Sequence, residues 1–171
     1  MQEKSFTVQS PLLKKLLADI LGFLTAFLAV AAAASLGGFF SPGDWYRTLE
    51  KPTWNPPDWI FGPVWSFLYL SMAIAGGLLW VARRHQEKPV IPALLLFFVQ
   101  LLLNALWTPL FFGLHWMGIA ALEIVALNLT VFACCIIFWK VNRFASALFW
   151  PYWAWVTFAS VLKITLYQMN S

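Results

Sequence analysis

Four residues within one apolar stretch repeat with helical spacing and could form a binding surface. Gln100, Asn104, Trp107 and Phe111 lie at i, i+4, i+7 and i+11, so a helix places them on one face. An amide inside a membrane is costly unless it faces protein or a cavity. Hydrogen bonds between helices would satisfy these amides. The aromatic neighbours favour a pocket, with Asn104 as its polar group.

Two other apolar stretches carry aromatic residues on single helical faces. Trp65 shares a face with Tyr69, and Tyr152 shares a face with Trp155 and Ala159. A helix rises about 1.5 Å per residue, which places these faces at overlapping depths in a membrane. We therefore expect the side chains to meet in one cavity.

Three ionisable residues lie inside apolar stretches: Asp19, which we place at the membrane interface, and Glu123 and Lys163. Glu123 and Lys163 would each cost about 2.5–3.5 kcal/mol alone at the centre of a bilayer. We predict that they pair, because a pair lowers both costs. The alternative is that Lys163 extends to the membrane surface.

Residues that ligate metals are few and dispersed. His85 and His115 fall in connections on opposite sides, and the adjacent Cys134 and Cys135 lie inside an apolar run, as core residues often do. The chain has no C-x-x-C motif and no His/Cys cluster, so we predict no metal site. No nucleophile or general-base arrangement is evident either, so a conventional enzyme is not expected.

The composition indicates a membrane protein. Of the 171 residues, 61% are hydrophobic and 11% are charged, whereas soluble domains carry about 25% charged residues. The net charge of +4 comes from basic residues at the ends of apolar stretches and not from a long basic run. This pattern argues against nucleic acid as a partner and for a lipid bilayer.

The predicted fold class is an all-α membrane protein, a five-transmembrane-helix bundle. Residues 1–15 form a polar N-terminal tail, residues 16–171 form the membrane domain, and residues 41–58 form a loop rich in Trp and Pro. A spanning helix needs about 20 mostly apolar residues. The stretches that qualify are Leu16–Phe40, Trp59–Ala82, Val90–Phe112, Met117–Trp139 and Ser146–Met169.

Basic residues predict the orientation of these spans. Two of them, Arg47 and Lys51, lie in the first connection, and eight lie on the opposite side. Cytoplasmic loops carry the excess of Lys and Arg, so in a plasma membrane the N-terminus is cytoplasmic. The eight are Lys4, Lys14, Lys15, Arg83, Arg84, Lys88, Lys140 and Arg143.

The first connection has an unusual composition. Asp44–Trp65 holds four tryptophans and four prolines between two apolar stretches. Proline stiffens the backbone and indole rings favour the headgroup level of a membrane. We predict a stiff lid over a flat apolar ligand, with Trp54 as its candidate contact. In the first span, Ala29, Ala33 and Gly37 have four-residue spacing, which suits either a dimer face or packing within the chain.

Three motifs, in order, resemble one family. The chain is similar to the TspO/translocator protein family, also called tryptophan-rich sensory proteins or peripheral-type benzodiazepine receptors. The resemblance covers nearly everything from Leu16 to Tyr167. The motifs are Trp45-Tyr46 with Leu49-Glu50-Lys51-Pro52-x-Trp54-x-Pro56-Pro57-x-Trp59-x-Phe61-x-x-x-Trp65, then Gln100-Leu101-x-x-Asn104-x-x-Trp107-x-Pro109-x-Phe111-Phe112-Gly113, then Pro151-Tyr152-x-x-Trp155.

The resemblance implies a five-helix bundle, often dimeric, that binds porphyrins such as protoporphyrin IX or haem as ligands and has no obligatory cofactor. Trp65 and Trp155 match two pocket tryptophans, which in some bacterial members support light- and oxygen-dependent porphyrin breakdown. Asn104 and Trp107 match ligand-contacting positions. The family's proposed sterol motif has Tyr where this chain has Ile164, so sterol binding through that motif is not expected.

We therefore predict a porphyrin-binding sensory or regulatory membrane protein, in which Trp65 and Trp155 take part in photo-oxidation. One alternative is a transporter or scavenger of porphyrins, lipids or sterols, and another is a structural protein whose tryptophans only mark the membrane interface. The candidate ligand-binding residues are Trp54, Trp65, Tyr69, Gln100, Asn104, Trp107, Phe111, Tyr152, Trp155 and Ala159.

Overall fold

The computed structural model describes residues 11–40, 42–83 and 89–171, and these ranges contain helices and no strand. The predicted all-α class is therefore confirmed. A short helix and a 3₁₀ turn, η1 (Asp58–Ile60), lie in the first connection, and a π-helical turn, η2 (Pro109–Gly113), follows the third long helix. The α-helices are α1 (Pro11–Phe39), α2 (Asp44–Thr48), α3 (Phe61–Ala82), α4 (Val90–Thr108), α5 (Met117–Val141) and α6 (Arg143–Asn170).

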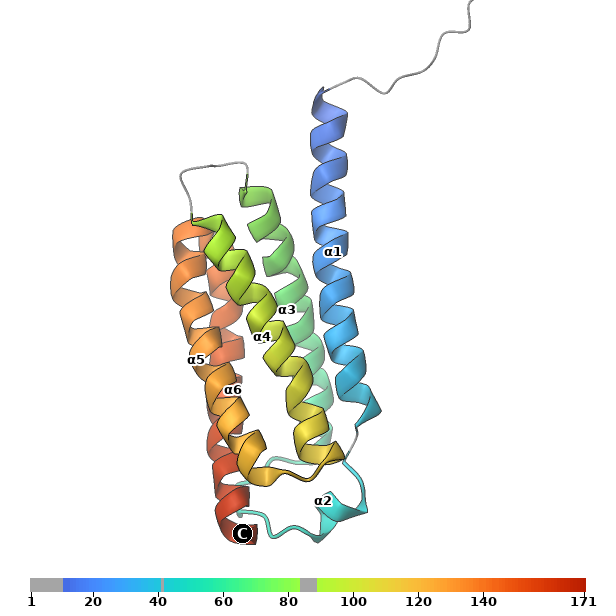
Figure 1. Cartoon of the computed structure of the whole chain (residues 1–171), viewed down its shortest axis with the longest axis vertical. Helices are drawn as coiled ribbons and strands as arrows, with labels where there is room; N and C mark the ends of the chain where they lie inside the picture. The colour runs from blue at the N-terminus through green and yellow to red at the C-terminus, as the bar shows by residue number, and fades with distance from the viewer. Residues whose placement is uncertain (1–10, 41, 84–88) are drawn as a thin grey trace, which may run out of the picture.

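The long helices run side by side, and α2 lies across one end of them (Figure 1). Helix α1 packs on α3 and α4, α4 packs on α5, and α5 packs along α6. Small residues bring α1 close to α3: the Cβ of Ala26 lies 2.9 Å from where a Cβ on Gly76 would be. The small residues of the first span thus serve packing within the chain, since Ala33 is buried in the same core.

Four described segments are long and apolar enough to cross a membrane: Pro11–Phe39, Asp58–Ala82, Val90–Gly113 and Met117–Val141. These helices establish a multi-pass membrane protein. Helix α6 has 28 residues, but its many Trp, Tyr, Ser and Thr residues and Lys163 make it less apolar than the other four. By length and composition, four described segments therefore qualify as spans, and the predicted fifth does not.

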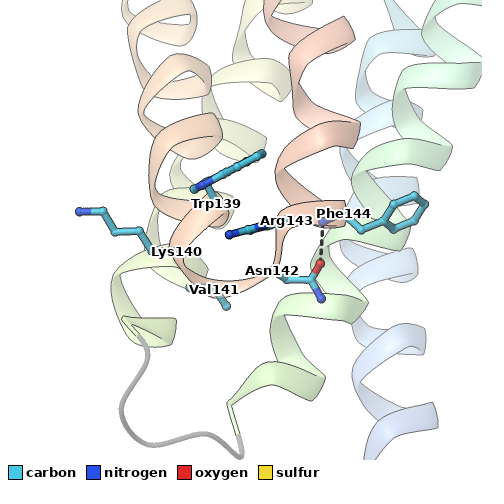
Figure 2. A pocket seen from close by; sticks show the side chains of 6 residues that line it. All are labelled: Trp139, Lys140, Val141, Asn142, Arg143 and Phe144. Atoms are coloured by element: carbon cyan, nitrogen blue, oxygen red, sulfur yellow. Dashed lines mark hydrogen bonds between the residues drawn. The ribbon is translucent and has the colours of Figure 1, made fainter.

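Helices α5 and α6 meet in a tight turn at the end of the bundle opposite α2. Asn142 is extended, with φ of −150°, and its Oδ1 accepts hydrogen bonds from the backbone N–H groups of Phe144 and Ala145. This N-cap starts α6 at Arg143, three residues before the predicted span. A surface hollow of about 620 Å³ adjoins this turn and is lined by residues 139–144, whose side chains are drawn in Figure 2.

Some predictions fall on residues that the structure does not describe. Helix α1 begins at Pro11, so the last five residues of the predicted tail are helical. Residues 1–10, 41 and 84–88 lie outside the described ranges. The predictions for Lys4, Arg84, His85 and Lys88 concern these residues and stay predictions.

Candidate functional site

A cavity of about 590 Å³ lies beneath the first connection, between the ends of the long helices. Its volume is typical of small-molecule sites, which range over about 300–1,000 Å³. Six of the ten candidate residues line it, from three different helices. They are Trp65 and Tyr69 of α3, Asn104 and Trp107 of α4, and Trp155 and Ala159 of α6.

The other four candidates lie outside the cavity wall. Gln100, Phe111 and Tyr152 are fully buried behind it. Trp54 is 45% exposed in the first connection and packs its ring edge-on against Phe158, with the ring centroids 6.0 Å apart. The helical face predicted from Gln100 to Phe111 is therefore shared between the cavity wall and the core behind it.

A chain of hydrogen bonds joins α3, α4 and α6 at the cavity. The hydroxyl of Tyr69 donates to Oδ1 of Asn104 at 3.1 Å, and Nδ2 of Asn104 donates to the Tyr152 hydroxyl at 3.0 Å. That hydroxyl donates in turn to Oε1 of Gln100 at 3.1 Å. Buried polar groups need such partners. Asn104 therefore acts as the link that fixes three helices and also forms part of the cavity wall.

Indole rings form much of the apolar wall. Trp65 lies against Tyr69 with ring centroids 5.4 Å apart, and Trp155 lies against Phe61 at 5.7 Å. The Nε1 donors of Trp107 and Trp155 are buried without a hydrogen-bond partner among the described residues. The wall therefore presents aromatic faces to the cavity, while these two N–H groups lie buried behind it.

The π-helical turn η2 carries two neighbouring phenylalanines that take different positions. Pro109 has no N–H and disturbs the regular helix, and the backbone N–H of Leu114 donates to the Pro109 carbonyl at 2.8 Å. Phe111 turns into the core and stacks on Trp107, with an interplanar angle of 14°. Phe112 lines the cavity instead.

Hydrogen bonds at one place and a ring stack at another hold the first connection over the cavity. Nδ2 of Asn170 donates to the Glu50 carbonyl and its Oδ1 accepts from the Glu50 N–H, each at 2.9 Å. Trp45 stacks on His115 with ring centroids 4.0 Å apart. His115 has a left-handed backbone with φ of 57°, which turns the α4–α5 connection toward the lid.

Charged groups gather at the cavity. Arg47, Lys51, Lys163 and Asp58 are among its lining residues. Arg47 pairs with Asp44 at 3.3 Å, and Nζ of Lys51 lies 4.5 Å from the centre of the Tyr46 ring. Burial, and then the charge of Asp58, raise the pKa of Tyr46. Tyr46 therefore stays a neutral phenol beside the cavity.

The predicted pair between Glu123 and Lys163 is wrong. Both carboxylate oxygens of Glu123 are buried with no hydrogen-bond partner within the described ranges. Lys163 is 5% exposed, so it does not extend to the surface either. Its Nζ lies instead among aromatic rings. Similar depth along two helices therefore does not establish that two side chains meet.

Within the described ranges, no group of three or more His, Cys, Asp or Glu residues could hold a metal ion. Cys134 and Cys135 are buried free thiols in the core. The ring of His115 is used in the stack with Trp45.

Several residues of the site escaped the sequence analysis. Thr108 and Phe112 line the cavity. Each follows Trp107 or Phe111 by one residue and therefore lies outside the helical face that the spacing of those two residues predicts. Gly37 also lines it, and a Cβ there would lie 3.5 Å from the Thr108 hydroxyl. Asn170 gave no signal, because its partner Glu50 is 120 residues away.

The chain matches known proteins over most of its length. The TspO/MBR family model matches residues 25–169. A protein named CrtK from Rhodobacter capsulatus is 41% identical over 148 residues, which are 86% of this chain and 92% of the relative.

Two other relatives have descriptive names. A tryptophan-rich sensory protein from Cereibacter sphaeroides is 36% identical over 148 residues, 86% of this chain and 90% of the relative. A translocator protein from Homo sapiens is 35% identical over 147 residues, 84% of this chain and 86% of the relative.

Proposed function

The chain belongs to the TspO/MBR family, and from that premise we propose that its cavity binds a flat tetrapyrrole, such as protoporphyrin IX or haem, in a sensory or regulatory role. The observation that carries the proposal is the convergence of three indole rings on one cavity. Trp65, Trp107 and Trp155 come from three helices and line the same space. A planar π-system can pack against such rings for about 0.5–1.5 kcal/mol per pair beyond burial.

The charges at the cavity support a ligand that carries carboxylates. Arg47 and Lys51 line the cavity from the first connection. Cations at this end would attract propionate groups, and charge-assisted hydrogen bonds are stronger than neutral ones. The apolar wall below suits the macrocycle. The ligand would therefore lie with its ring between the helices and its acidic groups near cations.

A titration tests the proposal. Protoporphyrin IX is added to the purified protein and Trp fluorescence is followed. Ala159→Phe puts a ring into the cavity and is expected to weaken binding at least about tenfold, by steric exclusion. Val161→Phe adds the same ring on the 53% exposed outer face of α6 and is the matched control. Equal affinities in the two variants would contradict binding in the cavity.

We also propose that Trp65 and Trp155 take part in light-dependent breakdown of the bound porphyrin. The excited porphyrin takes an electron from an indole and passes it to dioxygen, which gives an indole radical cation, superoxide and the ground-state porphyrin. The indole radical cation then takes one electron from the porphyrin and is restored, and superoxide adds to the resulting porphyrin radical cation, so that both atoms of dioxygen enter the ring as it opens. Under illumination in air, Trp65→Phe and Trp155→Phe should each slow bleaching of the bound porphyrin. Trp139→Phe, at the far end of the bundle, is the control. Bleaching at the wild-type rate in both cavity variants would remove the redox role.

A membrane bundle of five spans is part of the same proposal. Helix α6 is long enough to cross a bilayer at about 1.5 Å per residue, and it packs along α5. Its less apolar residues include Tyr152 and Lys163, which are buried inside the protein and not in lipid. The N-terminus would be cytoplasmic in a plasma membrane. A homodimer stays a prediction.

Transport is the second candidate, and the name of the human relative, translocator protein, favours it. In a transporter, the cavity would bind a porphyrin or lipid transiently during its passage across the membrane. Vesicles that contain the protein would then release a trapped porphyrin faster than empty vesicles. Equal release from both kinds of vesicle would leave binding and sensing as the function.

A further inference from the structure

Lys163 is a buried lysine with no counter-ion among the described residues. Its side chain lies on α6 and lines the cavity, yet the residue is only 5% exposed. No described carboxylate forms an ion pair with it, and no described acceptor hydrogen-bonds to it. Breaking a buried ion pair is strongly destabilising because it leaves a charge uncompensated. The charge of a lysine that is buried without a partner would therefore be stabilised by an anion from outside the chain.

Aromatic rings hold the ammonium in place. Nζ of Lys163 lies 2.8 Å from the ring centre of Phe111, 4.3 Å from that of Trp107 and 5.5 Å from that of Phe112. The negative faces of these rings attract a cation. The rings accept no proper hydrogen bond, however, so the donors of the ammonium still lack an oxygen acceptor.

The rest of the cavity points to the same missing group. Its lining carries three cationic residues, Arg47, Lys51 and Lys163, against one anionic residue, Asp58. A cavity with surplus positive charge fits an anion that brings several acceptor oxygens.

We propose that Lys163 binds a carboxylate of the ligand inside the cavity, so that the site selects acids with a flat apolar body over their neutral esters. This inference rests on the proposed function and adds a specific contact to it. Lys163 differs from the two other cations of the cavity. Arg47 has a side chain that is 80% exposed in its pair with Asp44, and salt screens exposed charges far more than buried ones.

The test compares protoporphyrin IX with its dimethyl ester, which has the same ring and no charge. Dissociation constants of both compounds are measured for the wild type and for Lys163→Met in the same detergent. Met is unbranched and fills the same apolar space. We expect the variant to lose roughly ten- to a hundredfold in affinity for the acid, as for a charged hydrogen bond, and to keep its affinity for the ester. Partition of the porphyrins into micelles cancels in the ratio between the two proteins.

Two further variants sharpen the comparison. Lys163→Arg retains the charge and should keep most of the preference for the acid. Lys51→Met removes a cation that lies over Tyr46 in the first connection, and it should change the preference less than Lys163→Met. Lys163→Leu is the second neutral variant if the Met variant does not fold, and its expected result is the same.

The outcomes separate the two proposals. If Lys163→Met keeps the wild-type ratio of acid to ester affinity, the role of Lys163 is overturned and tetrapyrrole binding stands. If the wild type binds neither compound, the proposed function is overturned and this inference falls with it.

Discussion

Asn104 shows how one polar residue can both join helices and line the cavity. Its amide accepts from Tyr69 and donates to Tyr152, so it joins the side chains of α3 and α6 through α4. It also lines the cavity at 4% exposure. In a membrane, no water is available to replace these hydrogen bonds. The same amide thus bonds two tyrosine hydroxyls, one of them buried and one at the cavity wall.

Replacing Asn104 should therefore destabilise the ligand-free protein. Asn104→Ala leaves the Tyr69 hydroxyl without its acceptor and the Tyr152 hydroxyl with Gln100 as its one partner, and the expected loss is about 1–3 kcal/mol. Thermal unfolding in detergent measures it. Tyr69→Phe removes one hydrogen bond at the end of the chain and should cost less, about 0.5–1.5 kcal/mol. An unchanged melting temperature for Asn104→Ala would show that the hydrogen-bonded chain contributes nothing to stability.

The residue scale also shows what the sequence could and could not reveal. Helical spacing placed Trp65, Asn104 and Trp155 on faces that do meet in one cavity. The same reasoning paired Glu123 with Lys163 from depth alone and was wrong. Spacing determines depth and face within one helix, but the rotation of two helices about their axes decides whether the side chains meet. Those rotations depend on how side chains pack between helices, for example on the contact between Ala26 and Gly76.

At the scale of elements, the first connection is the part that closes the cavity. It holds α2 and η1 and is fastened by Asn170 through two hydrogen bonds to the backbone of Glu50. The composition predicted a stiff lid from its prolines. The short helix α2 and the fastening by α6 were not predictable, because each depends on contacts far along the chain.

Loss of this fastening should loosen the lid without unfolding the bundle. Asn170→Ala removes both hydrogen bonds to Glu50, and amide exchange of Glu50 should become roughly 5- to 30-fold faster, as for a change of one or two kcal/mol. Thr165→Ala is the control, since the Thr165 hydroxyl bonds only within α6. Equal exchange rates in wild type and Asn170→Ala would mean that the lid is held by its aromatic contacts alone.

Helices α1 and α3 depend on small residues where they touch. A Cβ at Gly76 would come within 2.6 Å of the Phe97 ring and 2.9 Å of the Cβ of Ala26. Gly76→Ala should therefore destabilise the protein by about 1–3 kcal/mol, as overpacking does. Gly38 has nothing within 4 Å of such a Cβ, so Gly38→Ala should be neutral or slightly stabilising. Equal melting temperatures of the two variants would contradict this packing.

At the scale of the whole molecule, charge is distributed between the two ends of the bundle. The described basic residues at the end opposite the lid belong to the start of α1, the end of α3 and the turn between α5 and α6 (Figure 1): Lys14, Lys15, Arg83, Lys140 and Arg143. Arg47 and Lys51 lie in the lid. The excess of cations at the far end predicts that the lid faces outward in a plasma membrane. The cavity would then open toward the outer leaflet.

Labelling of intact cells checks this orientation. A membrane-impermeant maleimide should label Thr53→Cys in the lid and leave Lys140→Cys unlabelled until the cells are opened. Cys134 and Cys135 are buried, so the wild type is the blank. Labelling of Lys140→Cys in intact cells, with no labelling of Thr53→Cys, would show the opposite orientation.

The central claim is that indole rings from separate helices enclose a planar acid beneath the lid. A structure of the protein crystallised with protoporphyrin IX tests it most directly. The account predicts the macrocycle between Trp65 and Trp155, with one carboxylate within hydrogen-bonding distance of Lys163. A porphyrin that lies on the lipid-facing surface of the helices, with the cavity beneath the lid empty, would contradict it.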